Sequence, residues 1–196
     1  MIYEIGGHEV SIVRATPGLA KSYYDLLMEL YEDPNSYILV NYSKDPPQLE
    51  SIVERSKNWN VHPHYMHFAL YKDKVVGFAG SLLGPDYGPE VQPHIAEIYY
   101  GVSKGWRKTG LIYALLYTAL SDINAKIVKA TAYVENLPSI NVLLKIGLRI
   151  IAVLEENDFH YMSGKMHDDY LFRGFRSDCL NRLPGLLEKH GISVIR

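Results

Sequence analysis

A basic segment containing two glycines precedes the most apolar stretch of the chain. It reads Val102-Ser103-Lys104-Gly105-Trp106-Arg107-Lys108-Thr109-Gly110-Leu111-Ile112, and helical periodicity begins at Gly110. The first amides of a helix have no partners within the helix and lie at the positive end of its dipole, so they attract phosphate groups. Lys104, Arg107 and Lys108 add positive charge. These residues therefore predict a pyrophosphate site at the helix start.

Two common nucleotide motifs do not match this segment. Gly105 and Gly110 have the spacing of a P-loop, but Leu111 and Ile112 stand where that motif needs a lysine and a hydroxyl residue. The three-glycine pattern of dinucleotide-binding proteins is absent as well. A solvated basic turn before a helix stays open as the simpler alternative.

Composition limits the class of protein. The 196 residues are 47% hydrophobic and 21% charged, typical of one globular domain. A net charge of −2 argues against nucleic acid as a partner. The single cysteine, Cys179, cannot form an internal disulfide, which suits a cytoplasmic protein. We expect no membrane partner, because no export signal is apparent and the longest apolar run, 110–120, is too short to cross a bilayer.

Three histidines, His62, His64 and His67, suggest a metal site at first sight. In a strand, however, His62 and His64 share one face and His67 points to the other. A closed metal site needs three or four convergent ligands. We therefore predict no metal.

Hydrophobic periodicity predicts alternating strands and helices. Strands are expected over 10–15, 65–71, 75–83, 94–102, 126–134, 149–155 and 169–173, and helices over 18–31, 48–59, 110–124 and 138–145. A loop is expected over 157–168, then a helix over 179–190 and a strand over 192–195. This order predicts an α/β domain over 1–175 whose mixed central sheet has an antiparallel N-terminal half. The extension over 176–196 would pack on the domain or on a second subunit.

Two blocks resemble the GNAT superfamily of N-acetyltransferases. Residues 107–112 read Arg-Lys-Thr-Gly-Leu-Ile, similar to the family's Arg/Gln-x-x-Gly-x-Gly/Ala motif, with Val102 five residues before Arg107. The second block, 136–148, resembles the family's Asn-led helix that ends in Lys-x-Gly-Phe. The order of elements over 10–173 matches as well. The resemblance implies a GNAT-like acyl-CoA N-acyltransferase fold, with helices on both faces of the sheet and a splayed parallel strand pair.

The resemblance also implies acetyl-CoA as co-substrate. Gly101 and Val102 would offer backbone groups to the pantetheine and the thioester, and Asn136 would contact the cofactor. The phosphates would be held by Arg107, Lys108, Thr109, Gly110, Leu111 and Ile112.

Glu97 is the implied general base. It lies in Ala96-Glu97-Ile98, where some family members carry a catalytic glutamate. An amine arrives protonated and needs a base, and partial burial would raise the pKa of this carboxyl toward that task. A strand N–H would stabilise the oxyanion. The alternative is a structural carboxylate paired with a lysine or arginine.

Two positions depart from the family pattern. Ile112 replaces the last Gly/Ala of the phosphate motif, and Leu143 replaces the usual tyrosine acid, for which Tyr133 or Tyr170 could substitute. Both departures favour an alternative function, a catalytically inactive CoA-binding or sensor module.

The leading hypothesis is an acetyl-CoA-dependent N-acetyltransferase that works by direct attack of a primary amine in a ternary complex. The acceptor would be a small molecule, a polyamine or a protein amino group, selected by loops over 32–47, 84–93 and 157–168. A homodimer is possible.

Overall fold

A mixed β-sheet forms the centre of the computed structural model, which describes residues 1–38, 45–161 and 163–195. Within these residues the sheet has nine strands in the order β7-β8-β6-β5-β4-β3-β2-β1-β9. β5 and β6 are parallel, and the other neighbours are antiparallel. The strands are β1 (Ile2–Ile5), β2 (His8–Arg14), β3 (His64–Tyr71), β4 (Lys74–Leu83), β5 (Ile95–Val102), β6 (Ile127–Tyr133), β7 (Arg149–His160), β8 (Lys165–Phe175) and β9 (Ser193–Val194).

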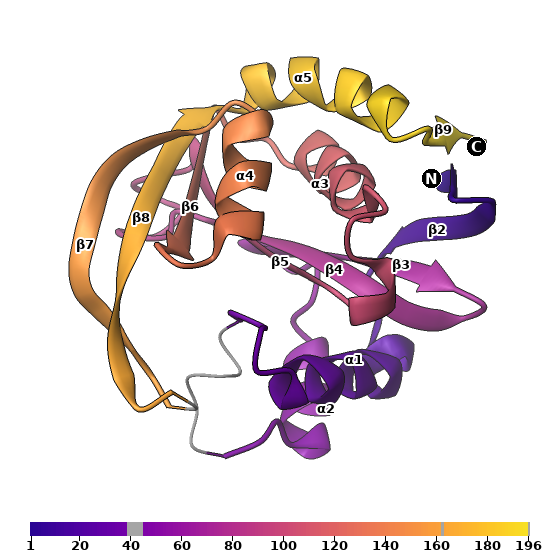
Figure 1. Cartoon of the computed structure of the whole chain (residues 1–196), viewed down its shortest axis with the longest axis horizontal. Helices are drawn as coiled ribbons and strands as arrows, with labels where there is room; N and C mark the ends of the chain where they lie inside the picture. Colours follow the sequence, from indigo (N-terminus) through magenta and orange to yellow (C-terminus); the bar gives the residue numbers. More distant parts are fainter. Residues whose placement is uncertain (39–44, 162, 196) are drawn as a thin grey trace.

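Helices cover both faces of the sheet, with α3, α4 and α5 on one face and α1 and α2 on the other (Figure 1). The prediction of a mixed α/β sheet with an antiparallel N-terminal half and helices on both faces is confirmed. The helices are α1 (Ala20–Glu32), α2 (Leu49–Ser56), α3 (Leu111–Asp122), α4 (Leu137–Lys145) and α5 (Arg176–Lys189), with short 3₁₀ turns η1 (Pro17–Leu19) and η3 (Lys104–Trp106).

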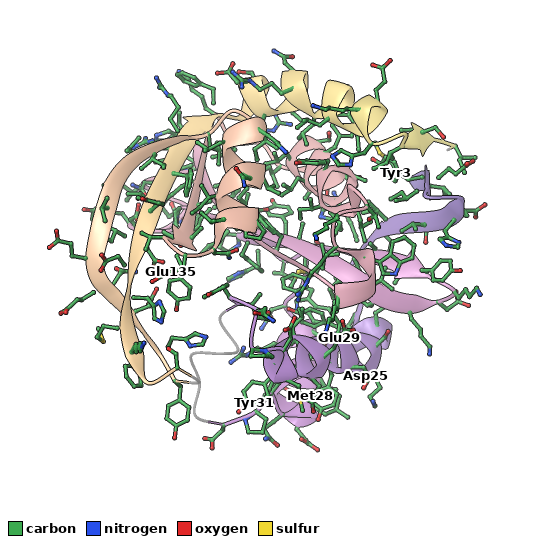
Figure 2. All side chains as sticks on the ribbon, in the orientation of Figure 1. Tyr3, Asp25, Met28, Glu29, Tyr31 and Glu135 are labelled. Carbon is green, nitrogen blue, oxygen red and sulfur yellow. The ribbon has the colours of Figure 1, made fainter. Side chains whose placement is uncertain are left out.

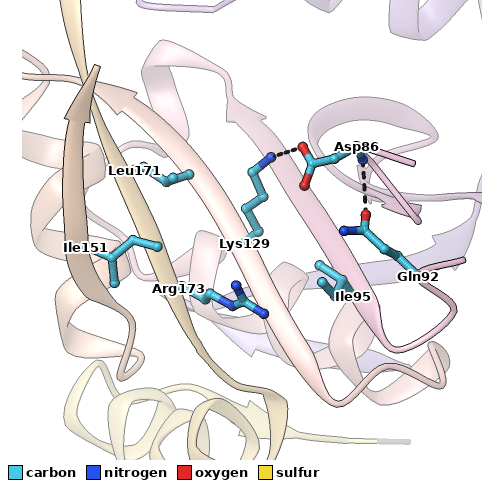
Figure 3. A pocket seen from close by; sticks show the side chains of 7 residues that line it. All are labelled: Asp86, Gln92, Ile95, Lys129, Ile151, Leu171 and Arg173. Atoms are coloured by element: carbon cyan, nitrogen blue, oxygen red, sulfur yellow. Dashed lines mark hydrogen bonds and ion pairs between the residues drawn. The ribbon is translucent and has the colours of Figure 1, made fainter. Parts of the chain in front are cut away.

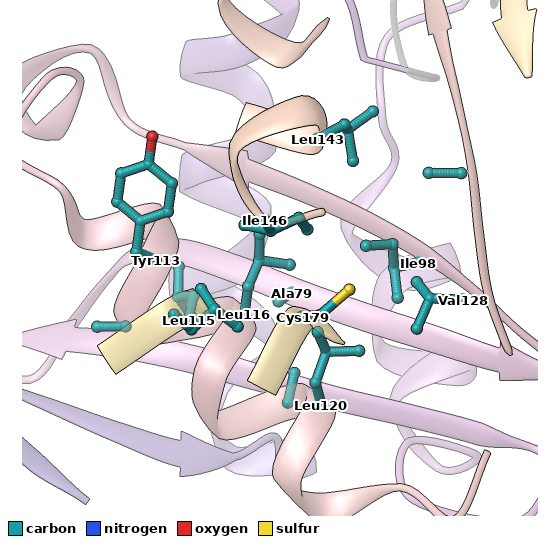
Figure 4. Packing of buried hydrophobic residues seen from close by; sticks show 14 of the residues in the cluster. Ala79, Ile98, Tyr113, Leu115, Leu116, Leu120, Val128, Leu143, Ile146 and Cys179 are labelled. Atoms are coloured by element: carbon teal, nitrogen blue, oxygen red, sulfur yellow. The ribbon is translucent and has the colours of Figure 1, made fainter. Parts of the chain in front are cut away.

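The larger core lies between the sheet and α3. Leu111, Leu115, Leu116 and Leu120 of α3 are fully buried, and Figure 4 shows three of them beside Cys179 of α5. Burial of such apolar surface is the main force that holds the layers together, at about 25 cal/mol per Å². A smaller core lies between α1 and the opposite face of the sheet.

The prediction of a loop over 157–168 is wrong. β7 continues to His160 and β8 begins at Lys165, so only residues 161–164 separate the two strands. The pairing shifts register between Leu154 and Asp158. The missed parts of these strands, 156–160 and 165–168, are mostly polar and lack the apolar alternation that marks a half-buried strand. Backbone pairing alone does not show in a sequence. β1 was also missed.

The C-terminal segment packs on the rest of the chain. α5 buries Cys179, Leu183 and Leu187 in the larger core, and β9 pairs with β1. The division into a domain over 1–175 and an extension stays a prediction. In the described residues no helix has the length and apolar character needed to cross a membrane.

Candidate active site

The parallel strands β5 and β6 separate soon after they begin. Their pairing runs from Ile95 opposite Ile127 to Glu97 opposite Lys129 and then ends. β5 nevertheless continues along β4 to Val102, and β6 continues along β8 to Tyr133. Among the described strands none fills the space between them. A V-shaped gap therefore opens in the sheet directly after Glu97.

The backbone of β5 presents hydrogen-bonding groups to this gap. The Ser103 amide donates to the Val76 carbonyl at 2.9 Å, and the Gly84 amide donates to the Ile95 carbonyl at 2.9 Å, so odd-numbered residues of β5 pair with β4. Successive residues of a strand direct their peptide groups to opposite edges. The peptide groups of Tyr100 and Val102 consequently face the gap.

Gly101 borders the same gap, but its own peptide groups face β4, where it pairs with Phe78. A Cβ at Gly101 would lie 2.5 Å from the Phe78 ring and 3.2 Å from a methyl of Leu30. The absence of a side chain therefore lets β5 lie close to the smaller core.

Glu97 lies at the apex of the gap with a half-buried side chain. Its Oε1 is 4.0 Å from Lys129 Nζ, which also contacts Asp86 Oδ1 at 2.5 Å. Burial raises the pKa of Glu97 above its ordinary value; Lys129 opposes this shift and Asp86 adds to it. A raised pKa makes the carboxylate a stronger base. The structure thus shows both features weighed from the sequence, a lysine partner and a perturbed carboxylate.

The end of α1 holds the loop between β5 and α3. The Lys104 amide donates to Glu29 Oε1 at 2.6 Å, and Arg107 Nη1 lies 2.6 Å from Asp33 Oδ2 (Figure 2 shows Glu29 on α1). Burial acts to raise the pKa of Asp33, but the Asn35 amide and the Arg107 guanidinium outweigh it, and the pKa is lowered. Arg107 is therefore already paired with an acid.

The start of α3 has the backbone form of an anion site. Lys108 and Gly110 have left-handed conformations with φ of 67° and 88°, and no side chain caps the helix. The Leu111 amide has only a long contact of 3.3 Å to Thr109 Oγ1. In the described part of the chain, the Ile112 amide has no acceptor. These amides, with Lys108 beside them, fit the phosphates of a nucleotide-like cofactor.

Gly110 and Ile112 contact other parts of the protein. A Cβ at Gly110 would lie 2.8 Å from the His190 side chain, so the end of α5 covers this side of the loop. The half-buried Ile112 side chain packs against the larger core.

Asn136 begins α4 as a helix cap, since its Oδ1 accepts a hydrogen bond from the Ser139 amide at 3.2 Å. Leu143 is fully buried in the larger core. A residue that the sequence analysis missed is Tyr100, whose hydroxyl contacts Ser139 Oγ at 2.8 Å and so bridges β5 to α4. Its only sequence signal is its alternation with Val102 along the strand.

A polar cluster at the far end of β6 was also missed. Tyr133 lies 4.8 Å from His167 between ring centroids, and Asn157 Nδ2 donates to Asp169 Oδ2 at 2.8 Å. Burial raises the pKa of Asp169 to about 7, and a hydrogen bond that the protonated Asp169 carboxyl donates to Asp158 adds to this shift. Tyr170 lies on β8 opposite Ala132.

The three histidines of the sequence motif do not converge. His67 is buried with Nε2 3.1 Å from Asp122 Oδ2, whereas His62 and His64 are exposed. The described residues contain no cluster of three potential metal ligands.

Several solved structures share this fold. A ribosomal-protein-alanine N-acetyltransferase from Brucella melitensis is 18% identical and superposes with a TM-score of 0.71, over 84% of this chain and 99% of that one. A phosphinothricin acetyltransferase from Sinorhizobium meliloti, solved in complex with acetyl-CoA, is 15% identical with a TM-score of 0.71, over 85% and 88%. A spermidine N-acetyltransferase chimera of Vibrio cholerae SpeG and hSSAT is 16% identical with a TM-score of 0.68, over 88% and 99%.

At the level of sequence, no curated protein matches the chain. The profile of the acetyltransferase (GNAT) family, however, matches residues 21–148. This range includes the gap, Glu97 and the loop between β5 and α3, which we call the phosphate-type loop. The chain therefore belongs to the GNAT acetyltransferase family.

Proposed function

We propose that the protein transfers the acetyl group of acetyl-CoA to a primary amine by direct attack in a ternary complex. The observation that carries this proposal is the gap between β5 and β6, because it opens beside a half-buried carboxylate and leads to an uncapped helix start. Acetyl-CoA supplies an activated acetyl group and a thiol leaving group when bound. Binding of the co-substrate, the general base and stabilisation of the oxyanion must come from the chain's own residues.

The gap and the α3 loop would hold the co-substrate. Peptide groups of Val102, beside Gly101, would bind the amide-rich pantetheine as a neighbouring strand would. The loop residues Arg107, Lys108, Thr109, Gly110, Leu111 and Ile112 would hold the phosphates through their amides and the Lys108 charge. Asn136 would border the open end of the gap from α4.

Glu97 would act as the general base. It accepts a proton from the acceptor's ammonium group, either directly or through one water, and so frees the lone pair that attacks. Lys129, whose Nζ lies 4.0 Å from the Glu97 carboxylate, would favour its charged form. The Tyr100 peptide N–H, which faces the gap, would stabilise negative charge that develops on the carbonyl oxygen.

Leu143 favours the second candidate, a catalytically inactive CoA-binding or sensor module. It is fully buried in the core, so no acid reaches the leaving thiolate from that position of α4. A thiol has an ordinary pKa of about 8.5, so water suffices as the proton source, and we rank transfer first.

Calorimetric titration with acetyl-CoA, followed by an assay of thiol release with a panel of amines, tests the proposal. Micromolar binding with amine-dependent thiol release is the expected result. Binding without release would favour the inactive module, and absence of binding would contradict both.

A further inference from the structure

A small cavity lies on the sheet face that carries the Glu97 side chain. It has a volume of about 230 Å³, and Ile95, Ile151 and Leu171 form its apolar part. Lys129 and Arg173 line it with positive charge, and Asp86 stands at its rim (Figure 3). Drug-sized ligands occupy cavities of about 300–1,000 Å³, so this one suits a smaller group.

Three cations lie side by side in the sheet here, and two of them, Lys129 and Arg173, line the cavity. Lys129 of β6 is opposite Arg173 of β8, and Arg173 is opposite Arg149 of β7. Residues directly opposite in neighbouring strands share a face, and like charges placed so destabilise a sheet. Asp86 pairs with Lys129, but in the described ranges no carboxylate forms an ion pair with Arg173 or Arg149. The cation row is therefore short of negative charge.

The same row contains the proposed base. Glu97 of β5 is opposite Lys129, which is opposite Arg173. Neighbouring strands lie about 4.8 Å apart, so Glu97 and Arg173 are two strand spacings apart at the backbone. Figure 3 shows the Arg173 side chain extending from β8 across β6 toward Ile95, which lies two residues before Glu97 on β5. A small ligand whose amine and anionic group are separated by a few bonds could contact both Glu97 and Arg173.

We propose that this cavity binds an anionic group of the acceptor, a carboxylate or a phosphonate, while the acceptor's amine lies at Glu97. This inference rests on the proposed function and narrows it, since it makes the acceptor a small amino acid or a related amino acid analogue. Arg173 binds the anion through its planar guanidinium, which matches carboxylate and phosphonate oxygens. Lys129 lies beside Arg173 with its charge already paired with Asp86, so Arg173 supplies most of the attraction for the anion. The aliphatic part of the acceptor contacts Ile95, Ile151 and Leu171.

Matched acceptors test this assignment. Glycine, β-alanine, γ-aminobutyrate, δ-aminovalerate and L-leucine are each assayed for acetylation beside the amine left when the carboxylate is removed. Aminoalkylphosphonates of the same lengths form a third arm, which distinguishes carboxylate from phosphonate. We expect at least one amino acid or aminophosphonate to exceed its matched amine in kcat/KM by about tenfold or more. Equal or better use of the plain amine at every chain length would overturn the inference.

Substitution of the arginine supplies the second test. Arg173→Gln should raise KM for the preferred acceptor by about tenfold or more and leave kcat for the plain amine near its wild-type value. Lys165→Gln, an exposed change at the far end of the same strand, is the control and should change neither. A preference for the anionic acceptor that survives Arg173→Gln would overturn the assignment.

A binding measurement separates this inference from the proposed function. Each amino acid is titrated by calorimetry into wild-type and Arg173→Gln protein without acetyl-CoA. Binding that Arg173→Gln abolishes would support the anion site even if no acetyl transfer occurred. In that case the proposed acetyl transfer would be contradicted and the anion site would stand. Absence of wild-type binding together with absence of any preference in turnover would contradict the site.

Discussion

Arg107 and Asp33 join the phosphate-type loop to the end of α1, with 2.6 Å between Nη1 and Oδ2. The Asp33 side chain is only 8% exposed, and its other oxygen accepts the Asn35 amide at 3.0 Å. The loop is therefore held in place by protein contacts. Because the Arg107 charge is already paired, we expect the loop amides and Lys108 to supply most of the attraction for phosphate.

Loss of this ion pair should destabilise the fold. Asp33→Asn leaves the Arg107 guanidinium without its acid and should lower the free energy of unfolding by about 1–3 kcal/mol, measured by urea denaturation. Glu32→Gln, at the exposed residue next to it, is the matched control. Equal stability of the two variants would show that the pair does not hold the loop.

Two glycines of the loop should respond differently to alanine. Gly110→Ala places a Cβ 2.8 Å from His190 on a backbone with φ of 88°, so we expect a loss of about 1–3 kcal/mol and weaker acetyl-CoA binding. At Gly105, whose ordinary φ any residue can adopt, a Cβ meets no atom within 4 Å. Gly105→Ala should therefore be nearly neutral. Calorimetry and thermal unfolding compare the two variants, and similar losses would contradict this explanation.

Removal of the Glu97 carboxylate should slow the chemical step. Glu97→Gln is expected to lower kcat about 100-fold or more at neutral pH, with little change in acetyl-CoA affinity. The raised pKa of Glu97 predicts that wild-type kcat falls as the pH decreases through that pKa, because the protonated carboxyl cannot accept a proton. The variant should lack this decline. Glu9→Gln, on an exposed part of β2, should behave as wild type; an unchanged kcat in Glu97→Gln would remove Glu97 from the mechanism.

Asp169 should make stability depend on pH. Its pKa is about 7 in the folded protein and about 3.9 in an unfolded chain, so its ionisation opposes folding. The protonated Asp169 carboxyl contributes its full stabilisation below about pH 4, and this contribution is lost as the pH rises through about 7. Asp169→Asn should therefore gain stability relative to wild type as the pH rises from about 4 to about 7, measured by urea unfolding, and the difference should then stay constant. The exposed Asp25→Asn is the control, and a pH-independent difference for Asp169→Asn would contradict the prediction.

Where burial leaves a periodic pattern, the sequence predicted the structure. Ala96 and Ile98, which the structure buries in the larger core, alternate with Glu97 and Tyr99, and this pattern marks β5 as a strand. The apolar stripe of α3 correctly predicted the central helix. The outer part of the β7–β8 ribbon, beyond the predicted strands over 149–155 and 169–173, was missed because polar residues such as Glu156 and Asp168 carry no such pattern.

Residues that meet only through the tertiary fold could not be predicted. The Tyr100–Ser139 contact joins residues on separate elements, and the pairing of Arg107 with Asp33 depends on where α1 ends. The row of Lys129, Arg173 and Arg149 likewise exists only once β8 lies between β6 and β7. β1 did leave a signal, since buried Tyr3 and Ile5 alternate with exposed Glu4 before a two-glycine turn.

Amine-dependent release of the CoA thiol from acetyl-CoA, with the acetylated product identified by mass spectrometry, tests the central claim most directly. Wild-type protein should release thiol only when an amine acceptor is present, and Glu97→Gln should reduce that release about 100-fold or more. Thiol release at background level with every acceptor, from protein that binds acetyl-CoA, would contradict the account and identify the chain as an inactive CoA-binding module.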